Sequence, residues 1–175
     1  MNDEPLRRLP ELLTDRLVLR PVTYPLAAAV LAGDLSAVLP APGWPHADTR
    51  DALGPLVAAG DPRAESGWLI TRADNGTVIG DCGWYGGPDP DGDAEIGYGL
   101  AAPSRGHGYG TEAVAALVGW VRDQPDVRRV VAGTLADNVP SRRLLERLGF
   151  SVDSVDGPTV RYALDAGTST TGPPG

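Results

Sequence analysis

The chain has 175 residues, which suffices for one compact domain with a buried core but not for two of ordinary size. Its 15 basic and 23 acidic residues give a net charge of −8, which argues against a nucleic-acid partner because such proteins need clustered positive charge. Every basic residue is arginine, so the sequence excludes sites that need a P-loop lysine or a Schiff-base lysine.

The sequence shows no pattern typical of a membrane helix, a signal peptide or a metal site. No apolar run approaches the roughly 20 residues of a membrane helix, and the opening M-N-D-E-P-L-R-R lacks the layout of a signal peptide. We therefore expect a cytoplasmic protein. His46, His107 and the single Cys82 leave no metal-ligand spacing, so no metal is expected. Cys82 is interpreted as a small buried strand residue, with a His–Cys nucleophilic pair as the alternative.

In chain order, the first half predicts a strand, two helices and a hairpin. A strand over residues 17–22 is followed by a short helix over residues 26–31. Asp48 or Thr49 is suited to cap a second helix that runs to Ala59. The turn D-N-G then joins two strands into a hairpin, over residues 68–71 and 77–85.

The second half alternates strands with amphipathic helices. A strand over residues 94–100 contains Gly97 and Gly99, which predict a bulge or a close approach by a ligand. The clearest helix spans residues 108–122 and precedes a buried strand over residues 130–135.

The last elements are a capped helix and a strand. Asn138 is expected to cap the helix, Gly149 to end it in the left-handed conformation, and a final strand to follow over residues 159–164. We expect an α/β (α+β) fold in one domain over residues 13–165, after an N-terminal extension over residues 1–12 and before a disordered tail over residues 166–175.

The loop R-G-H-G-Y-G-T, residues 105–111, lies between a strand and the clearest helix. Its alternating glycines leave the backbone amides accessible at a helix N-terminus, which favours an anion such as a pyrophosphate. A loop that merely starts the helix is the alternative. The spacing is not that of the dinucleotide fingerprint, because Thr111 stands where its last glycine would be.

R-G-H-G-Y-G-T-E-A resembles the R-x-x-G-x-G/A pyrophosphate loop of GNAT-type N-acetyltransferases, with Arg105, Gly108 and Gly110 at its fixed positions. T-D-R-L-V-L-R-P and A-E-I-G-Y-G-L resemble two strands of the ribosomal-protein N-terminal acetyltransferase branch. N-V-P-S-R-R-L-L and E-R-L-G-F resemble its CoA-side helix and that helix's exit. The resemblance implies a mixed, mostly antiparallel twisted sheet of about six or seven strands with about four helices.

The resemblance also implies a reaction and the residues that bind its donor. The protein would be an enzyme that transfers an acetyl group from acetyl-CoA to a primary amine by direct attack in a ternary complex. The amides of residues 107–111 would hold the pyrophosphate, and the pantetheine arm would add like a strand to the sheet. The implied cofactor-binding residues are Leu100, Ala102, Arg105, Gly106, His107, Gly108, Tyr109, Gly110, Thr111 and Asn138.

Two residues are candidates for proton transfer. Glu95 stands at the strand end nearest the acyl site and is the candidate base, through a water; a solvated strand-end carboxylate is the alternative. Ser141 is the candidate acid for the leaving thiolate, against a role only in starting its helix. A backbone N–H near Leu100 would stabilise the oxyanion. Leu145 occupies the position at which one branch of the family has a tyrosine acid.

The sequence leaves open alternatives for the function, the acceptor and the role of one acidic loop. A non-catalytic acyl-CoA-binding regulator and a phosphate- or nucleotide-binding module unrelated to CoA are the alternative functions. The candidate acceptors are a protein N-terminus, an amino acid, a polyamine and an aminoglycoside. Residues 24–66 and 86–93 would select among them. In that last segment Asp89, Asp91 and Asp93 form either a solvated turn or an acidic collar for a cationic amine. A homodimer is the default oligomeric state.

Overall fold

The computed structural model describes residues 8–61 and 65–167. It divides into two compact units: one comprises Met1–Trp84 with Gly97–Leu117, and the other comprises Tyr85–Ile96 with Val118–Gly175. Two elements belong partly to each unit, the strand β6 (Asp93–Leu100) and the helix α3 (Tyr109–Arg122). Most of the predicted tail and the first part of the predicted N-terminal extension lie outside the described residues.

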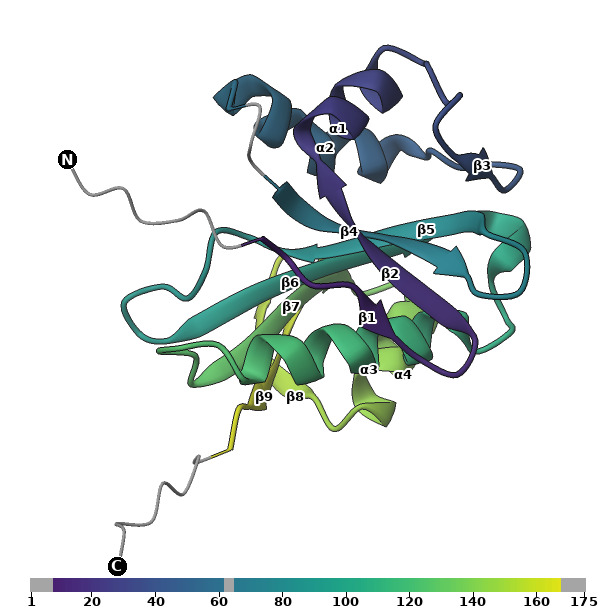
Figure 1. Cartoon of the computed structure of the whole chain (residues 1–175). Coiled ribbons are helices and arrows are strands. Elements are labelled where there is room, and N and C mark those ends of the chain that lie inside the picture. Colours follow the sequence, from purple (N-terminus) through teal and green to yellow (C-terminus); the bar gives the residue numbers. More distant parts are fainter. Residues whose placement is uncertain (1–7, 62–64, 168–175) are drawn as a thin grey trace, which may run out of the picture. The chain divides into compact units, whose positions relative to one another are not determined.

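The first unit is built on an antiparallel set of strands (Figure 1). β2 pairs with β1 on one side and with β4 on the other, and β4 pairs in turn with β5. The short β3 adds to β5 in parallel. The bounds are β1 (Leu12–Leu13), β2 (Leu17–Thr23), β3 (Leu39–Pro40), β4 (Glu65–Arg72) and β5 (Thr77–Trp84). The hairpin predicted at D-N-G is therefore confirmed.

The helices of the first unit are α1 (Tyr24–Leu31), α2 (Ala47–Ala59) and the 3-10 turn η1 (Ala102–Ser104). The predicted cap of α2 is wrong. His46 is the cap, and its ring nitrogen Nδ1 accepts the N–H of Thr49 at 3.3 Å. An imidazole nitrogen can take the place of the usual hydroxyl or carboxylate oxygen because it too is an acceptor one turn ahead of that N–H. Gly60, with φ 70°, ends the helix as expected.

Alternate residues of the strands form the core of the first unit. Leu17 and Leu19 of β2 are fully buried, as are Trp68 and Ile70 of β4, which follows from the period of two in a strand. Cys82 of β5 is also buried, and desolvation raises the pKa of its thiol well above the usual range. Cys82 is therefore a protonated core residue.

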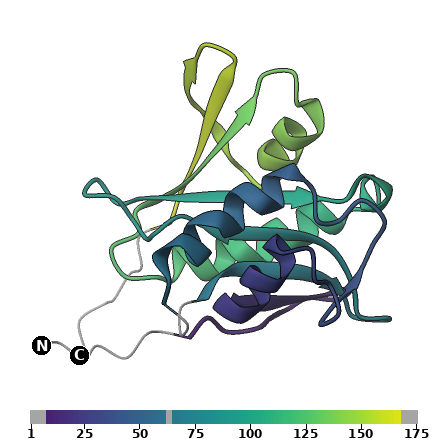
Figure 2. The ribbon, with the colours of Figure 1, turned by 90° about the horizontal axis from the view of Figure 1, so that it is seen from above.

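The second unit contains the first half of β6, the end of α3, three further strands and the helix α4. β6 pairs in parallel with β7, and β9 lies antiparallel between β7 and β8. Figure 2 shows the β8–β9 hairpin, in yellow, beside β7, in green. The bounds are β7 (Arg129–Leu135), α4 (Val139–Arg147), β8 (Ser151–Asp156) and β9 (Thr159–Asp165).

Helix α4 begins and ends as the sequence predicts. Asn138 caps it, and Gly149 follows it with φ 90°. The Phe150 N–H then donates to the Leu145 carbonyl at 3.1 Å, which closes the turn at the helix end, and Phe150 is buried. In contrast, β8 carries only exposed residues, so hydrophobic alternation does not mark its bounds.

These elements give the expected α+β architecture, with mixed, mostly antiparallel strands and four α-helices over the described ranges. No helix among them is long and apolar enough to span a bilayer.

Candidate active site

The glycine loop links η1 to α3 within the first unit. Gly106 and Gly108 have φ of 79° and 81°, in the left-handed region that side chains disfavour. No heavy atom lies within 4 Å of the place where a Cβ on Gly106 would stand. The loop therefore has the backbone shape and the open surface that a phosphate group requires.

The loop runs directly into the first turn of α3. The Glu112 N–H donates to the Gly108 carbonyl at 3.1 Å. By helix geometry, amides ahead of Glu112 have no acceptor within the helix, so they are available to an anion at the positive end of the helix dipole. Tyr109, Gly110 and Thr111 are half-buried in this turn. The predicted anion site is thus a loop and a helix start on one continuous segment.

The residues before the loop form the end of β6 and η1. The carbonyl of half-buried Leu100 accepts the Nε–H of exposed Arg105 at 3.0 Å, so this guanidinium is held against the strand end. Ala101 donates its N–H to Ile79 of β5 at 2.8 Å, and Ala102 is exposed at the start of η1. The end of β6 is thereby fixed beside β5, with Ala102 open to solvent.

The close approach predicted at Gly99 is made by the protein itself. A Cβ on Gly99 would stand 2.7 Å from Cε1 and 2.9 Å from Nε2 of His46. The imidazole that caps α2 therefore packs on the backbone of β6. The position of His46 therefore requires a glycine at residue 99.

His46 belongs to a buried polar cluster that no sequence motif indicated. Asp81 of β5 is 8% exposed; its Oδ2 accepts the indole N–H of Trp44 at 2.9 Å and the hydroxyl of Thr49. His46 Nε2 lies 3.8 Å from the same oxygen. Burial raises the pKa of Asp81 despite these hydrogen bonds. The signal that could have found the cluster is an aspartate within the apolar strand V-I-G-D-C.

The remaining predicted site residues lie in the second unit. Asn138 is exposed, and its Oδ1 accepts the Ser141 N–H at 3.3 Å, which confirms the cap. Glu95 is exposed in β6, opposite Val131 of β7. Leu145 is fully buried, so the position of the family's tyrosine is here a core position. The catalytic roles of Glu95 and Ser141 stay predictions.

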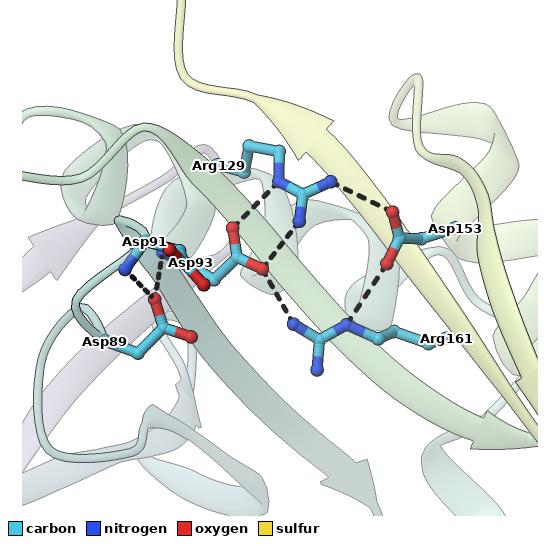
Figure 3. A network of polar contacts seen from close by, with 6 residues as sticks. All are labelled: Asp89, Asp91, Asp93, Arg129, Asp153 and Arg161. Atoms are coloured by element: carbon cyan, nitrogen blue, oxygen red, sulfur yellow. Dashed lines mark hydrogen bonds and ion pairs between the residues drawn. The ribbon is translucent and has the colours of Figure 1, made fainter.

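In the acidic loop before β6, Asp93 is paired with two arginines, so the loop does not present three free carboxylates (Figure 3). An electrostatic role of the exposed Asp89 and Asp91 stays a prediction. Asp93 binds the Arg129 guanidinium through both oxygens, at 2.8 and 2.7 Å, and accepts Arg161 Nη2 at 2.8 Å. Asp89 Oδ1 accepts the N–H groups of Asp91 and Asp93, each at 2.9 Å. Asp89 thus shapes the turn and Asp93 joins the strands, because both side chains find partners inside the unit.

Within residues 8–61 and 65–167 there is no group of three or more His, Cys, Asp or Glu side chains that could hold a metal ion.

Comparisons with known proteins agree on one family. Residues 16–151 match the acetyltransferase (GNAT) domain family. The chain is 32% identical over 146 residues to a Bacillus subtilis protein named uncharacterized N-acetyltransferase YjdG, covering 78% of this chain and 87% of that protein.

Solved structures share the fold. A GNAT-family acetyltransferase from Bacillus anthracis aligns with a TM-score of 0.64 at 18% identity, covering 90% of this chain and 99% of that one. Mycobacterium smegmatis RimJ, solved with CoA-disulfide, aligns with a TM-score of 0.58 at 22% identity, covering 86% and 82%. The neighbours also include a ribosomal-protein-S5-alanine acetyltransferase from Vibrio fischeri, with a TM-score of 0.62 at 15% identity, covering 90% and 97%. The chain belongs to the GNAT acetyltransferase family, and this membership implies acetyl-CoA as the acyl donor.

Proposed function

We propose that this acetyltransferase transfers the acetyl group of acetyl-CoA to a primary amine, by direct attack within a ternary complex. The observation that carries the proposal is the open glycine loop from Arg105 to Thr111 at the start of α3. The acceptor is a small-molecule amine or the N-terminus of a peptide. A cytoplasmic location and a homodimer remain predictions from the sequence.

The donor's pyrophosphate would bind the amides of residues 107–111, and Gly106 would leave room for its approach. Leu100 and Ala102 would lie along the pantetheine arm, and Arg105 would add positive charge near the phosphates. Asn138 would contact the CoA chain in addition to its cap. These assignments rest on the family resemblance, and the positive φ of Gly106 and Gly108 supports them.

The reaction forms a C–N bond and breaks the thioester C–S bond, and a proton passes from the amine to the departing thiolate. We propose that Glu95 takes the amine proton through a water and that Ser141 passes a proton to the sulfur while it is reprotonated by solvent, to which Glu95 then releases its proton. At pH 7 an α-amine of pKa about 8 is about 10% neutral, which costs about 1.4 kcal/mol. A lysine of pKa about 10.4 costs about 4.6 kcal/mol by the same arithmetic, so weakly basic amines need the least assistance.

Gly108→Val tests the donor site. A side chain at Gly108, whose φ is 81°, would strain the backbone of the loop, and its Cβ would stand 3.2 Å from Arg16 Nη2. The loop should therefore lose its shape, and we expect the affinity for acetyl-CoA to fall at least about tenfold in calorimetric titration. Gly33→Val is the matched control, because Gly33 has φ 82°, has no heavy atom within 4 Å of the place where its Cβ would stand, and lies outside the loop. Both variants place a branched side chain at a similar positive φ, and only Gly108→Val alters the glycine loop and presses on a neighbouring side chain. If Gly108→Val binds acetyl-CoA as the parent does, the donor site is not this loop.

Glu95→Gln tests the proposed base separately. This variant keeps the shape of an exposed side chain and removes its basicity, so turnover should fall while acetyl-CoA affinity stays as in the parent. Thiol release with a mixture of amines measures turnover. Unchanged turnover from about pH 6 to 9 would show that Glu95 is only a solvated strand residue.

A further inference from the structure

Arg16, at the approach to β2, contacts the glycine loop although 91 residues separate it from His107. Its Nη1 donates to the His107 carbonyl at 3.0 Å. A Cβ on Gly108 would stand 3.2 Å from its Nη2, and its guanidinium carbon lies 4.6 Å from the centre of the Tyr109 ring. One side chain thus touches three consecutive residues of the loop.

The contact with the His107 carbonyl fixes the orientation of the peptide plane between His107 and Gly108. In a trans peptide, the carbonyl of one residue and the N–H of the next point in opposite directions. Because Arg16 holds the His107 carbonyl, the N–H of Gly108 is directed away from Arg16. That N–H is one of the amides that the proposed function assigns to the pyrophosphate.

Arg16 also neutralises Glu112, which lies in the first turn of α3. Glu112 accepts Arg16 Nε–H at 2.7 Å, the backbone N–H of Arg16 at 2.8 Å and the hydroxyl of Thr14 at 2.6 Å. Burial acts to raise the pKa of Glu112, but hydrogen bonds from Thr14 and Arg16 lower it below its usual value. Glu112 is therefore anionic, and without Arg16 its charge would repel an anion at the loop.

We propose that Arg16 is a positioning residue for the acyl donor: it orients the Gly108 amide toward the pyrophosphate and cancels the charge of Glu112. This inference rests on the proposed function, because it concerns the same loop. It predicts that Arg16 acts only on donors that carry the pyrophosphate.

The test compares two donors, acetyl-CoA and S-acetylpantetheine, which lacks the pyrophosphate. Arg16→Met should weaken acetyl-CoA binding by about tenfold or more, as for the loss of a charge-assisted hydrogen bond. It should raise the KM for acetyl-CoA, leave kcat at saturation as in the parent, and leave the KM for S-acetylpantetheine unchanged. Arg20→Met is the control, since Arg20 is an exposed arginine of β2, four residues after Arg16, and its Nε lies 3.9 Å from Glu11.

Two further variants separate orientation from charge. Arg16→Lys keeps the charge but cannot bind a carbonyl and a carboxylate with one planar group, so it should recover only part of the affinity. Adding Glu112→Gln to Arg16→Met removes the repulsive charge and should recover part of the affinity as well.

The outcomes distinguish this inference from the proposed function. Parent-like acetyl-CoA binding by Arg16→Met, or an equal rise of both KM values, would overturn the role of Arg16 while leaving the donor site in place. A parent protein that binds no acetyl-CoA, or Gly108→Val binding it normally, would instead overturn the proposed function, whatever Arg16 does.

Discussion

Asp81 in the first unit and Asp93 in the second are both aspartates of a strand with 8% exposure, yet their chemistry is opposite. Asp81 is bonded by the neutral donors of Trp44 and Thr49, and burial raises its pKa. Asp93 is bonded chiefly by Arg129, and this contact with that of Arg161 lowers its pKa. Equal exposure of the side chain therefore does not fix the pKa of a carboxyl group; desolvation dominates at Asp81 and the charge of the donors dominates at Asp93.

The two shifts have opposite consequences for stability. Asp93 has a lowered folded pKa, so its contribution is present above its unfolded pKa, about 3.9, and is lost as pH falls through the folded value. Asp81 has a raised folded pKa, so its contribution is present below about 3.9 and is lost as pH rises through the folded value.

The largest effect should come from Asp93→Asn. The substitution leaves Arg129 and Arg161 without a carboxylate, and we expect the free energy of unfolding at pH 7 to fall by about 2–3 kcal/mol. This loss is no larger than the smallest losses expected when a fully buried ion pair is broken, because both guanidiniums are partly exposed and their charges are screened by solvent. Urea denaturation at pH 7 and pH 3 measures it. A difference from the parent that does not shrink at pH 3 would contradict the ion-pair explanation.

A smaller effect of opposite sign is expected for Asp81→Asn. The amide oxygen can still accept from Trp44 and Thr49, and the buried charge is gone. Stability at pH 7 should stay level or rise by about 1 kcal/mol. Asp81→Ala, which leaves both donors unpaired, should lose about 2 kcal/mol. The comparison fails if Asn and Ala destabilise the protein equally in thermal and urea denaturation.

The smallest effect is expected for Asp91→Asn, in the turn that precedes Asp93. The side chain is exposed, and its backbone N–H donates to Asp89, a bond that the substitution keeps. Stability should change by less than about 0.5 kcal/mol, and the KM for a cationic amine should keep its salt dependence. A KM that rises and loses its salt dependence would support an electrostatic role for this loop.

Local patterns predicted much of the fold. The apolar face of α3, the Asn138 cap and the Gly149 helix end each depend on residues a few positions apart, and each is confirmed. The glycine loop was located for the same reason, since its left-handed residues are close together in the chain.

The errors arose where a side chain finds a distant partner. The sequence did not indicate that His46 would lie on Gly99, or that Asp93 would join Arg129 and Arg161. Both contacts bear on alternatives that the sequence left open: the close approach at Gly99 is made by His46, and Asp93 is paired within its own unit. The His46 cap of α2 is the exception, because it joins residues only three positions apart.

The sequence by itself determined the family, the order of most elements and the loop proposed for the donor, because motif spacing and hydrophobic period are properties of neighbouring residues. Only the tertiary structure decided the direction in which the pKa of Asp81 and of Asp93 is shifted, and the hydrogen bond from Arg16 to His107. Such contacts form when strands pair, and they bring together residues 36, 68 or 91 positions apart whose proximity no local pattern encodes.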